Sequence, residues 1–157
     1  MIAWLSGKVV DLIGNNVILN CHGVGYQIFC SNSLMQTIVI GEQKEVLIHT
    51  DVREDAINLY GFIDSLEKKV FLLLITVKGV GAKTASDILS KIDRSQIVMA
   101  ISNQDLSKIS SIKGIGKKTA ELIIVELKDK VQLLLSEVGD TKSGSSFNEA
   151  IEKIGRA

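Results

Sequence analysis

The sequence has no proline, few aromatic residues (4%) and only two cysteines in 157 residues. Cys21 and Cys30 lie in apolar, strand-like segments without a C-x-x-C spacing, so we expect two reduced thiols in a core. The two histidines, His22 and His49, are too few and too scattered to suggest a zinc site. We attach no function to the missing proline. Together, these scarcities predict a protein without a metal site or a cofactor.

Long apolar runs are also missing. The runs at residues 72–75 and 122–125 are far shorter than the roughly 20 apolar residues that a membrane-spanning helix needs. Residues 1–4 do not begin the pattern of a secretory signal, in which a basic start precedes a longer apolar region. We therefore expect a cytoplasmic protein that has no membrane partner.

The charges balance over the whole chain but not along it. The formal net charge is zero, with 18 basic and 18 acidic side chains. Residues 1–62 carry 3 basic and 6 acidic side chains, residues 63–135 carry 12 and 8, and residues 136–157 carry 3 and 4. The basic excess of the middle segment is a modest indication of nucleic-acid binding.

The same middle segment contains a nine-residue repeat. Residues 77–85 read VKGVGAKTA, and residues 112–120, which lie 35 positions later, read IKGIGKKTA. Both copies follow the pattern apolar, Lys, Gly, apolar, Gly, any residue, Lys, Thr, Ala. A motif repeated at one offset predicts two copies of one supersecondary unit.

Each copy has the features of a tight turn between two helices. Glycines permit positive φ angles and clear side chains from the turn. The N–H groups that begin the second helix have no intrahelical acceptor, and with the helix dipole they form an anion site. Lys83 and Lys118 fall in the first turn of that helix, where a cation is unfavourable unless an anion binds. The repeated turn therefore indicates phosphate binding.

Simpler interpretations of the turn remain. A Gly-x-Gly turn can be only a tight corner, and lysines at a helix start are usually only solvated; the repetition of both favours the anion site. The phosphate loop of nucleotide-binding proteins requires G-x-x-x-x-G-K-[ST] after a strand. Here Ala82 separates Gly81 from Lys83, two lysines separate Gly116 from Thr119, and no strand-like run precedes either turn. We exclude nucleotide binding at these turns.

The fold class that the sequence predicts is α+β. Turn signals separate five apolar-rich, strand-like runs at residues 2–13, 17–21, 26–30, 46–50 and 57–62, and one short helical turn is expected within residues 33–40. Five strands in such a short segment suggest an OB-fold-like closed β-barrel, because closure removes the sheet edges.

From Ser65 the apolar period becomes helical and predicts an all-α region of about five helices. Asp93 or Ser95 would cap the helix through residue 100, Asn103 the next one, and a long final helix would run from residue 117 to 135. The expected organisation is a barrel at 1–62, a tandem helix-hairpin-helix domain at 63–136, a flexible linker at 137–146 and a short helical remnant at 147–157.

An acidic pair, Glu54 and Asp55, falls between the fourth and fifth strand-like runs. Adjacent carboxylates in such a loop are most simply a solvated turn. No neighbouring histidine, metal cluster or nucleophile supports acid–base catalysis there, so we expect no catalytic residue.

These motifs together resemble a known family. Two helical hairpins with Gly-x-Gly turns resemble tandem helix-hairpin-helix motifs, which bind DNA backbone phosphates with little sequence preference. A barrel, then VREDA at 52–56, LYGF at 59–62 and GIGKKTAE at 114–121, together with GVGY at 23–26, closely resembles the RuvA family of bacterial Holliday junction branch-migration subunits. The resemblance covers residues 1 to about 135.

The resemblance implies a homotetramer that binds a four-way DNA junction in homologous recombination and DNA repair. It implies partnership with the hexameric ATPase motor RuvB and with the resolvase RuvC. Glu54 and Asp55 would form an acidic pin that guides strands apart at the crossover. The phosphate-binding residues would be Gly79, Gly81, Lys83, Thr84, Gly114, Gly116, Lys117, Lys118 and Thr119.

The sequence departs from the family at its end. Family members continue after the linker into a three-helix domain that contacts the motor, which requires roughly 40 residues. Here residues 147–151 look like the start of such a helix and only residues 152–157 follow, so motor binding is in doubt while junction binding is not.

Two other function classes share some of these features. A helix-hairpin-helix glycosylase or nuclease would need a Gly/Pro-rich loop that leads to a catalytic Asp after the second turn, and residues 121–130 contain none. A generic DNA-binding or protein-interaction module without junction selectivity is the remaining alternative. The lysines in the first helical turns favour phosphate over a protein partner. The resemblance to RuvA implies that the chain itself has no catalytic or ATPase site and is a non-catalytic subunit of an ATP-dependent branch-migration complex.

Overall fold

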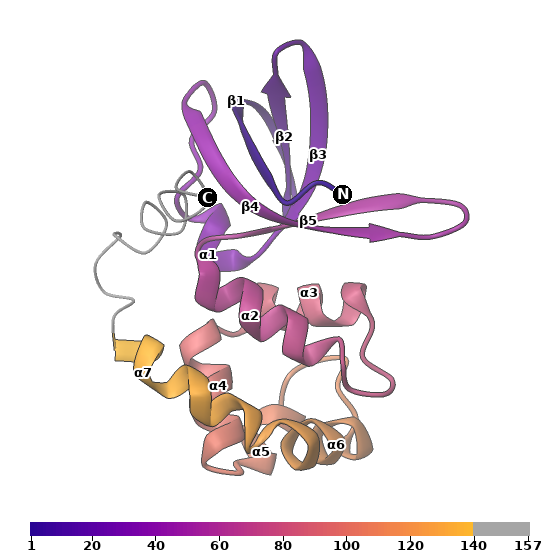
Figure 1. Ribbon diagram of the computed structural model, residues 1–157, viewed down its shortest axis with the longest axis vertical. Coiled ribbons are helices and arrows are strands. Elements are labelled where there is room, and N and C mark those ends of the chain that lie inside the picture. Colours follow the sequence, from indigo (N-terminus) through magenta and orange to yellow (C-terminus); the bar gives the residue numbers. More distant parts are fainter. Residues whose placement is uncertain (140–157) are drawn as a thin grey trace. The chain divides into compact units, whose positions relative to one another are not determined.

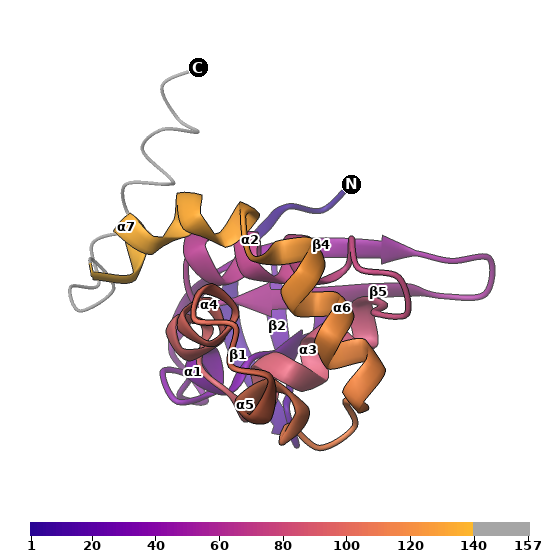
Figure 2. The ribbon, with the colours of Figure 1, turned by 90° about the horizontal axis from the view of Figure 1, so that it is seen from below.

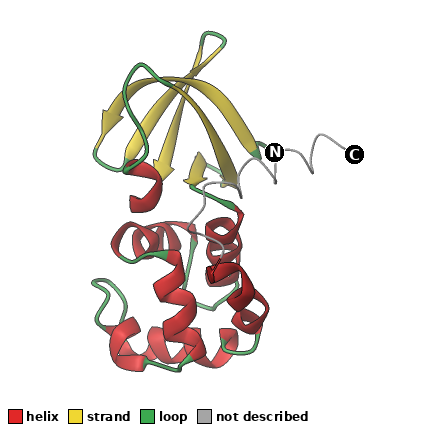
Figure 3. Ribbon diagram, turned by 90° about the vertical axis from the view of Figure 1, so that its left-hand side faces the viewer, coloured by secondary structure: helices red, strands yellow, loops and turns green. Residues whose placement is uncertain are grey.

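The computed structural model describes residues 1–139, which form two compact units with a boundary between Ile63 and Asp64 (Figure 1). The first unit contains five strands and one short helix, and the second unit is helical (Figure 3). The α+β fold class is therefore confirmed. Within residues 1–139, no helix has the length and apolar character needed to cross a membrane.

The first unit is a closed five-stranded barrel with the neighbour order β1-β2-β3-β5-β4. Only the β3–β5 pair is parallel. The short helix α1, at the position where a helical turn was expected, connects β3 to β4 and is capped by the Ser31 side chain, which accepts a hydrogen bond from the Leu34 N–H. The strands are β1 (Trp4–Ile13), β2 (Asn16–Cys21), β3 (Val24–Cys30), β4 (Gln43–Val52) and β5 (Ile57–Phe62), and α1 is Asn32–Met35.

Strand β1 closes the barrel because it pairs with two neighbours. Its first half pairs with β4 and its second half with β2, and the register shifts between Val9 and Asp11. Such a bulge bends a strand and increases its twist, which lets one strand serve both partners. Inward-facing aliphatic side chains fill the interior, among them Val17, Leu19 and Ile28, all fully buried.

Hairpin β4–β5 extends beyond the barrel wall. Strand β4 pairs with β1 only as far as Leu47, and β5 pairs with β3 only from Leu59 onward. The β4–β5 ladder itself continues outward to the Val52–Ile57 pair. Its outer end is therefore a two-stranded ribbon, which projects away from the other strands in Figure 1.

The second unit contains two helical hairpins joined by α4. Their apolar faces meet in one core that includes Phe71, Leu74, Ile101, Ile123 and Leu127, each at most 1% exposed. The helices are α2 (Ser65–Leu74), α3 (Ala82–Lys91), α4 (Arg94–Ser102), α5 (Leu106–Ser110) and α6 (Lys117–Leu127), followed by the 3₁₀ helix η1 (Lys130–Leu134) and α7 (Leu135–Val138).

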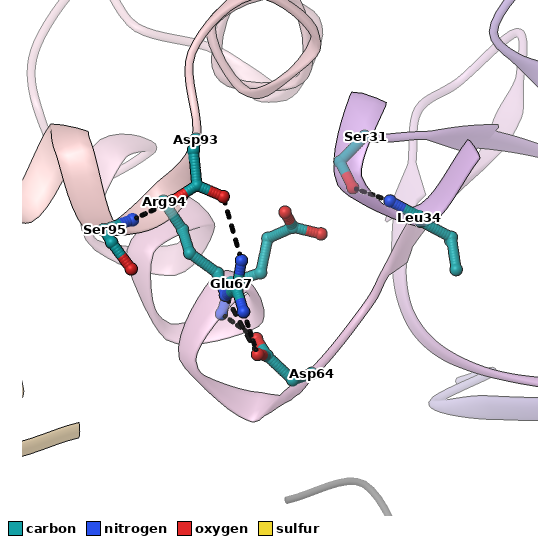
Figure 4. A network of polar contacts seen from close by, with 7 residues as sticks. All are labelled: Ser31, Leu34, Asp64, Glu67, Asp93, Arg94 and Ser95. Atoms are coloured by element: carbon teal, nitrogen blue, oxygen red, sulfur yellow. Dashed lines mark hydrogen bonds and ion pairs between the residues drawn. The ribbon is translucent and has the colours of Figure 1, made fainter. Parts of the chain in front are cut away.

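A buried polar cluster links the starts of α2 and α4 (Figure 4). Asp64 caps α2 by accepting the Glu67 N–H at 2.9 Å, and its other oxygen accepts Nη2 and Nε of Arg94 at 2.7 and 2.9 Å. Arg94 also contacts Asp93, which caps α4 by accepting the Ser95 N–H. Because α2 leads into the first hairpin turn and α4 leads toward the second, the cluster connects the two hairpins.

The helix ends differ from the sequence-based expectation at two places. Asp105, rather than Asn103, caps α5. The single long helix expected from residue 117 to 135 was wrong, because α6 ends at Leu127 and η1 follows (Figure 2). The Gln132 side chain of η1 donates to the Lys128 carbonyl, just after α6, and to Ser102 on α4.

The structure describes the first three residues of the linker expected at 137–146. Glu137 lies in α7, and its carboxylate accepts a hydrogen bond from Lys69 Nζ on α2 at 2.6 Å. A partner on α2 thus holds a residue that composition alone assigned to the linker. Residues 140–146 of the expected linker and the remnant expected at 147–157 lie outside the described residues.

Candidate nucleic-acid interface

The two repeated segments form turns with the same hydrogen bonds. The Val80 N–H donates to the Val77 carbonyl at 3.0 Å, and the Ile115 N–H donates to the Ile112 carbonyl at 3.1 Å. All four of these aliphatic side chains are buried, so they anchor each turn in the hydrophobic core. The structure therefore brings each pair of exposed glycines next to the lysines that begin the following helix.

The glycines of each turn serve two different purposes. Gly79 and Gly114 have φ angles of 89° and 97°, in the left-handed region that favours glycine. Gly81 and Gly116 have φ angles of −89° and −78°, which any residue can adopt. A Cβ at Gly116 would meet no atom within 4 Å. Neither the backbone conformation nor the packing requires a glycine at position 116. A ligand that approaches the backbone closely would require one, because a side chain would block it.

The helices that follow these turns differ from their neighbours in their caps. The N-cap residues of α2, α4 and α5 are Asp64, Asp93 and Asp105, and each carboxylate accepts a backbone N–H of its helix. Helices α3 and α6 begin at Gly81 and Gly116 and have no side-chain cap. No side chain therefore accepts from their first N–H groups, which lie at the positive end of the helix dipole.

The predicted cations stand beside these open N–H groups. Lys83 is the second residue of α3, and Lys117 and Lys118 are the first two residues of α6; all three side chains are exposed. Thr84 and Thr119 lie one residue further along each helix and are half-buried. Backbone donors, helix dipole and ammonium groups are thus combined at each turn, which is an arrangement suited to phosphate.

Sequence reasoning missed a further cation at the second turn. Lys91, in the last turn of α3, donates from Nζ to the Lys113 carbonyl at 2.6 Å. The residue that lies 35 positions after Lys91 is Glu126, so the repeat gives no signal for this contact. Only the packing of α3 beside the second turn reveals it.

The predicted acidic pair lies at the tip of the β4–β5 ribbon in the first unit. Glu54 and Asp55 are exposed, and the Arg53 N–H donates to the Ala56 carbonyl at 2.8 Å to close the turn. Arg53 Nε donates to Asp51 Oδ2 at 3.0 Å. This hydrogen bond and the charge of Asp51 raise the pKa of Arg53. Asp51 lies in β4 and Arg53 follows the last residue of that strand, so the pair joins the strand end to the turn.

Other types of site find no support in the part of the chain that the structure describes. Within residues 1–139, no three His, Cys, Asp or Glu side chains come together as metal ligands. Cys21 and Cys30 are thiols that are not joined in a disulfide, and burial raises the pKa of Cys21. Such a thiol is less reactive, because the thiolate is the nucleophilic form.

Comparison with known proteins gives the same two parts in the same order. The family model for the RuvA N-terminal domain matches residues 1–61, and the model for the SAM-like helix-hairpin-helix tandem matches residues 71–129.

Whole proteins match as well. A Trichlorobacter lovleyi protein named Holliday junction branch migration complex subunit RuvA is 45% identical over 96% of this chain and 74% of its own length. Proteins of the same name from Flavobacterium psychrophilum and Rickettsia prowazekii are each 38% identical, over 98% and 100% of this chain and 81% and 79% of their own lengths. With these matches along nearly its whole length, the chain belongs to the RuvA family.

Proposed function

We propose that this protein binds four-way (Holliday) DNA junctions by their structure rather than their sequence, as the junction-recognition subunit of a branch-migration complex in homologous recombination and DNA repair. The observation that carries the proposal is the pair of uncapped helix starts at Gly81 and Gly116, each with exposed lysines beside it. Family membership supports the same conclusion.

Backbone phosphates are the ligand that these turns fit. The phosphate-binding residues are Gly79, Gly81, Lys83 and Thr84 at the first turn and Gly114, Gly116, Lys117, Lys118 and Thr119 at the second. Contacts of this kind fix a protein on the duplex but carry no sequence information. Binding is therefore dominated by charge, and log K falls by about 0.9 per neutralised phosphate for each unit of log salt.

The acidic tip of the β4–β5 ribbon acts as a pin at the crossover. Glu54 and Asp55 are exposed at the end of a two-stranded ribbon, where a ligand can reach both carboxylates. Carboxylates repel phosphates, so the pin guides strands apart rather than binding them. This role is the reverse of the one played by the lysines at the helical turns.

The assembly and its partners follow from the proposed substrate. A junction has four arms, and a cyclic homotetramer presents one helical unit to each of them. The hexameric ATPase RuvB supplies the motor and the resolvase RuvC cleaves the junction, while this chain supplies no catalysis. We place the complex in the cytoplasm, where bacterial chromosomal DNA lies.

A competition gel shift tests the proposal. Labelled four-way junction is challenged with an excess of linear duplex of equal length over a series of salt concentrations. We expect linear DNA to compete poorly and binding to weaken steeply with salt. Equal competition by linear DNA would leave only generic helix-hairpin-helix binding, and salt-independent binding would favour a protein-interaction module.

A double variant tests the site itself. Gly114→Asp together with Gly116→Asp places two carboxylates where the phosphate binds. We expect junction binding to be abolished while the barrel stays folded, as judged by the fluorescence of Trp4 in the first unit. A variant that binds junctions as tightly as the wild type would refute the assignment of the turn.

A further inference from the structure

Lys91 connects the two hairpins at the proposed DNA-binding surface. It belongs to the last turn of α3, the second helix of the first hairpin, yet its ammonium group lies against the second turn. Nζ is 2.6 Å from the Lys113 carbonyl oxygen and 3.9 Å from the point where a Cβ on Gly114 would lie. A side chain from one hairpin therefore brings a positive charge to the turn of the other.

A purely structural role would use only part of this group. An ammonium has three N–H donors, and the Lys113 carbonyl takes one of them. The charge also complements the negative end of the α3 dipole. Lys91 is exposed, so neither effect contributes much to stability in water. Among residues 1–139, the Lys113 carbonyl is the one hydrogen-bond acceptor of this ammonium, so two of its donors remain for a ligand or water beside the second turn.

We propose that Lys91 is a further phosphate-contacting residue, which completes the second hairpin's site from α3 while its bond to Lys113 holds it in place. The inference rests on the proposed function and extends it to a residue outside the repeated motif. The ligand is a DNA backbone phosphate bound at the same time by the first N–H groups of α6.

The two hairpin turns differ in the number of lysines beside them, and Lys91 increases this difference. Lys78 and Lys83 flank the first turn, whereas Lys113, Lys117 and Lys118 already flank the second before Lys91 is added. The residue equivalent to Lys91 in the second hairpin, 35 positions later, is the acidic Glu126. The second turn is therefore the stronger phosphate anchor of each subunit.

Two substitutions of Lys91 separate charge from packing. Lys91→Met keeps an unbranched stem and removes the ammonium, and Lys91→Arg keeps the charge. The matched control is Lys130→Met, which removes another exposed lysine of the same unit from η1. Junction affinity is measured for each protein over a salt series, together with the thermal unfolding midpoint.

We expect Lys91→Met to weaken junction binding at 0.15 M salt by about fivefold for each phosphate that the protein no longer neutralises. The slope of log K against log salt should become shallower by about 0.9 for each such phosphate. Lys91→Arg should retain most of the affinity and slope, and Lys130→Met should change neither. The unfolding midpoint of Lys91→Met should stay close to that of the wild type.

Two results would overturn the inference. An unchanged salt slope for Lys91→Met, with or without a lower unfolding midpoint, would make Lys91 only a strut between α3 and the turn. A wild-type protein that binds no DNA would overturn both this inference and the proposed function. Normal wild-type binding with an unaffected Lys91→Met variant would remove the inference alone.

Discussion

Replacing Gly116 by serine should make the protein more stable and its DNA binding weaker. Gly116 is the N-cap of α6, with φ −78° and ψ 165°, and a side chain there meets open space. A serine in this conformation places Oγ where it accepts the N–H of the second or third helical residue, Lys118 or Thr119. The hydroxyl would thus satisfy the donors that we assign to phosphate.

The gain in stability and the loss of DNA affinity can be estimated separately. A serine cap is worth a few tenths of a kcal/mol over glycine, and removing a glycine from the unfolded chain adds about 0.4–1 kcal/mol. In a unit of this size, each kcal/mol raises the unfolding midpoint by about 4–8 °C. A hydrogen bond to a charged group contributes about 1.5–3 kcal/mol, so removing one per subunit weakens binding at least about tenfold.

The measurements are thermal unfolding followed by far-ultraviolet circular dichroism and junction affinity by gel shift. Gly139→Ser is the matched control, because Gly139 is exposed, has φ −72° and also leaves open space for a Cβ, but lies at the C-terminus of α7. The control should retain wild-type affinity. A higher unfolding midpoint for Gly116→Ser with unchanged junction affinity would show that the amides of α6 are not the phosphate site. A lower unfolding midpoint would refute the capping argument.

Two further predictions concern stability. Asp64→Asn keeps an oxygen to cap α2 but leaves the buried Arg94 with only the partly exposed Asp93 as its partner. We expect the free energy of unfolding, measured in urea, to fall by about 2–3 kcal/mol, which is at or below the usual range for a broken buried pair. A fall of less than about 0.5 kcal/mol would contradict this. Burial lowers the pKa of Lys68, so its charge opposes folding at neutral pH; Lys68→Met should raise the free energy of unfolding by a few tenths of a kcal/mol at pH 7. That advantage should shrink as pH rises through the lowered pKa of Lys68, and an advantage that grows with pH would contradict the sign.

Local sequence signals predicted the parts of the fold that depend on local chemistry. The barrel followed from five short apolar runs with turn signals between them, and strand β5 has the bounds expected from residues 57–62. The two hairpin turns followed from the positions of their glycines, because a left-handed φ angle at Gly79 and Gly114 is a local requirement. The acidic loop also lies at a turn between strands, as its composition indicated.

Features that depend on tertiary packing were not predictable from one sequence. Asp64 and Arg94 are 30 residues apart, and nothing in their spacing indicates that they share a buried ion pair. Lys91 reaches Lys113 across 22 residues, outside the repeat. The end of α6 has no glycine or proline to mark it, and the hydrogen bond from Gln132 to Ser102 of α4, 30 residues away, lies just after it.

The Asp51–Arg53 pair explains how the ribbon tip stays acidic although it contains an arginine. Without a partner, the Arg53 guanidinium would attract the phosphates that, in our proposal, Glu54 and Asp55 repel. Asp51, in β4, lies two residues earlier and accepts a hydrogen bond from Arg53 Nε at 3.0 Å, so the tip keeps a formal excess of two negative charges among these four residues. The pair is exposed and adds little to stability. Its effect is electrostatic: Asp51 offsets the one cation that would otherwise weaken the contrast between the acidic tip and the basic helical turns.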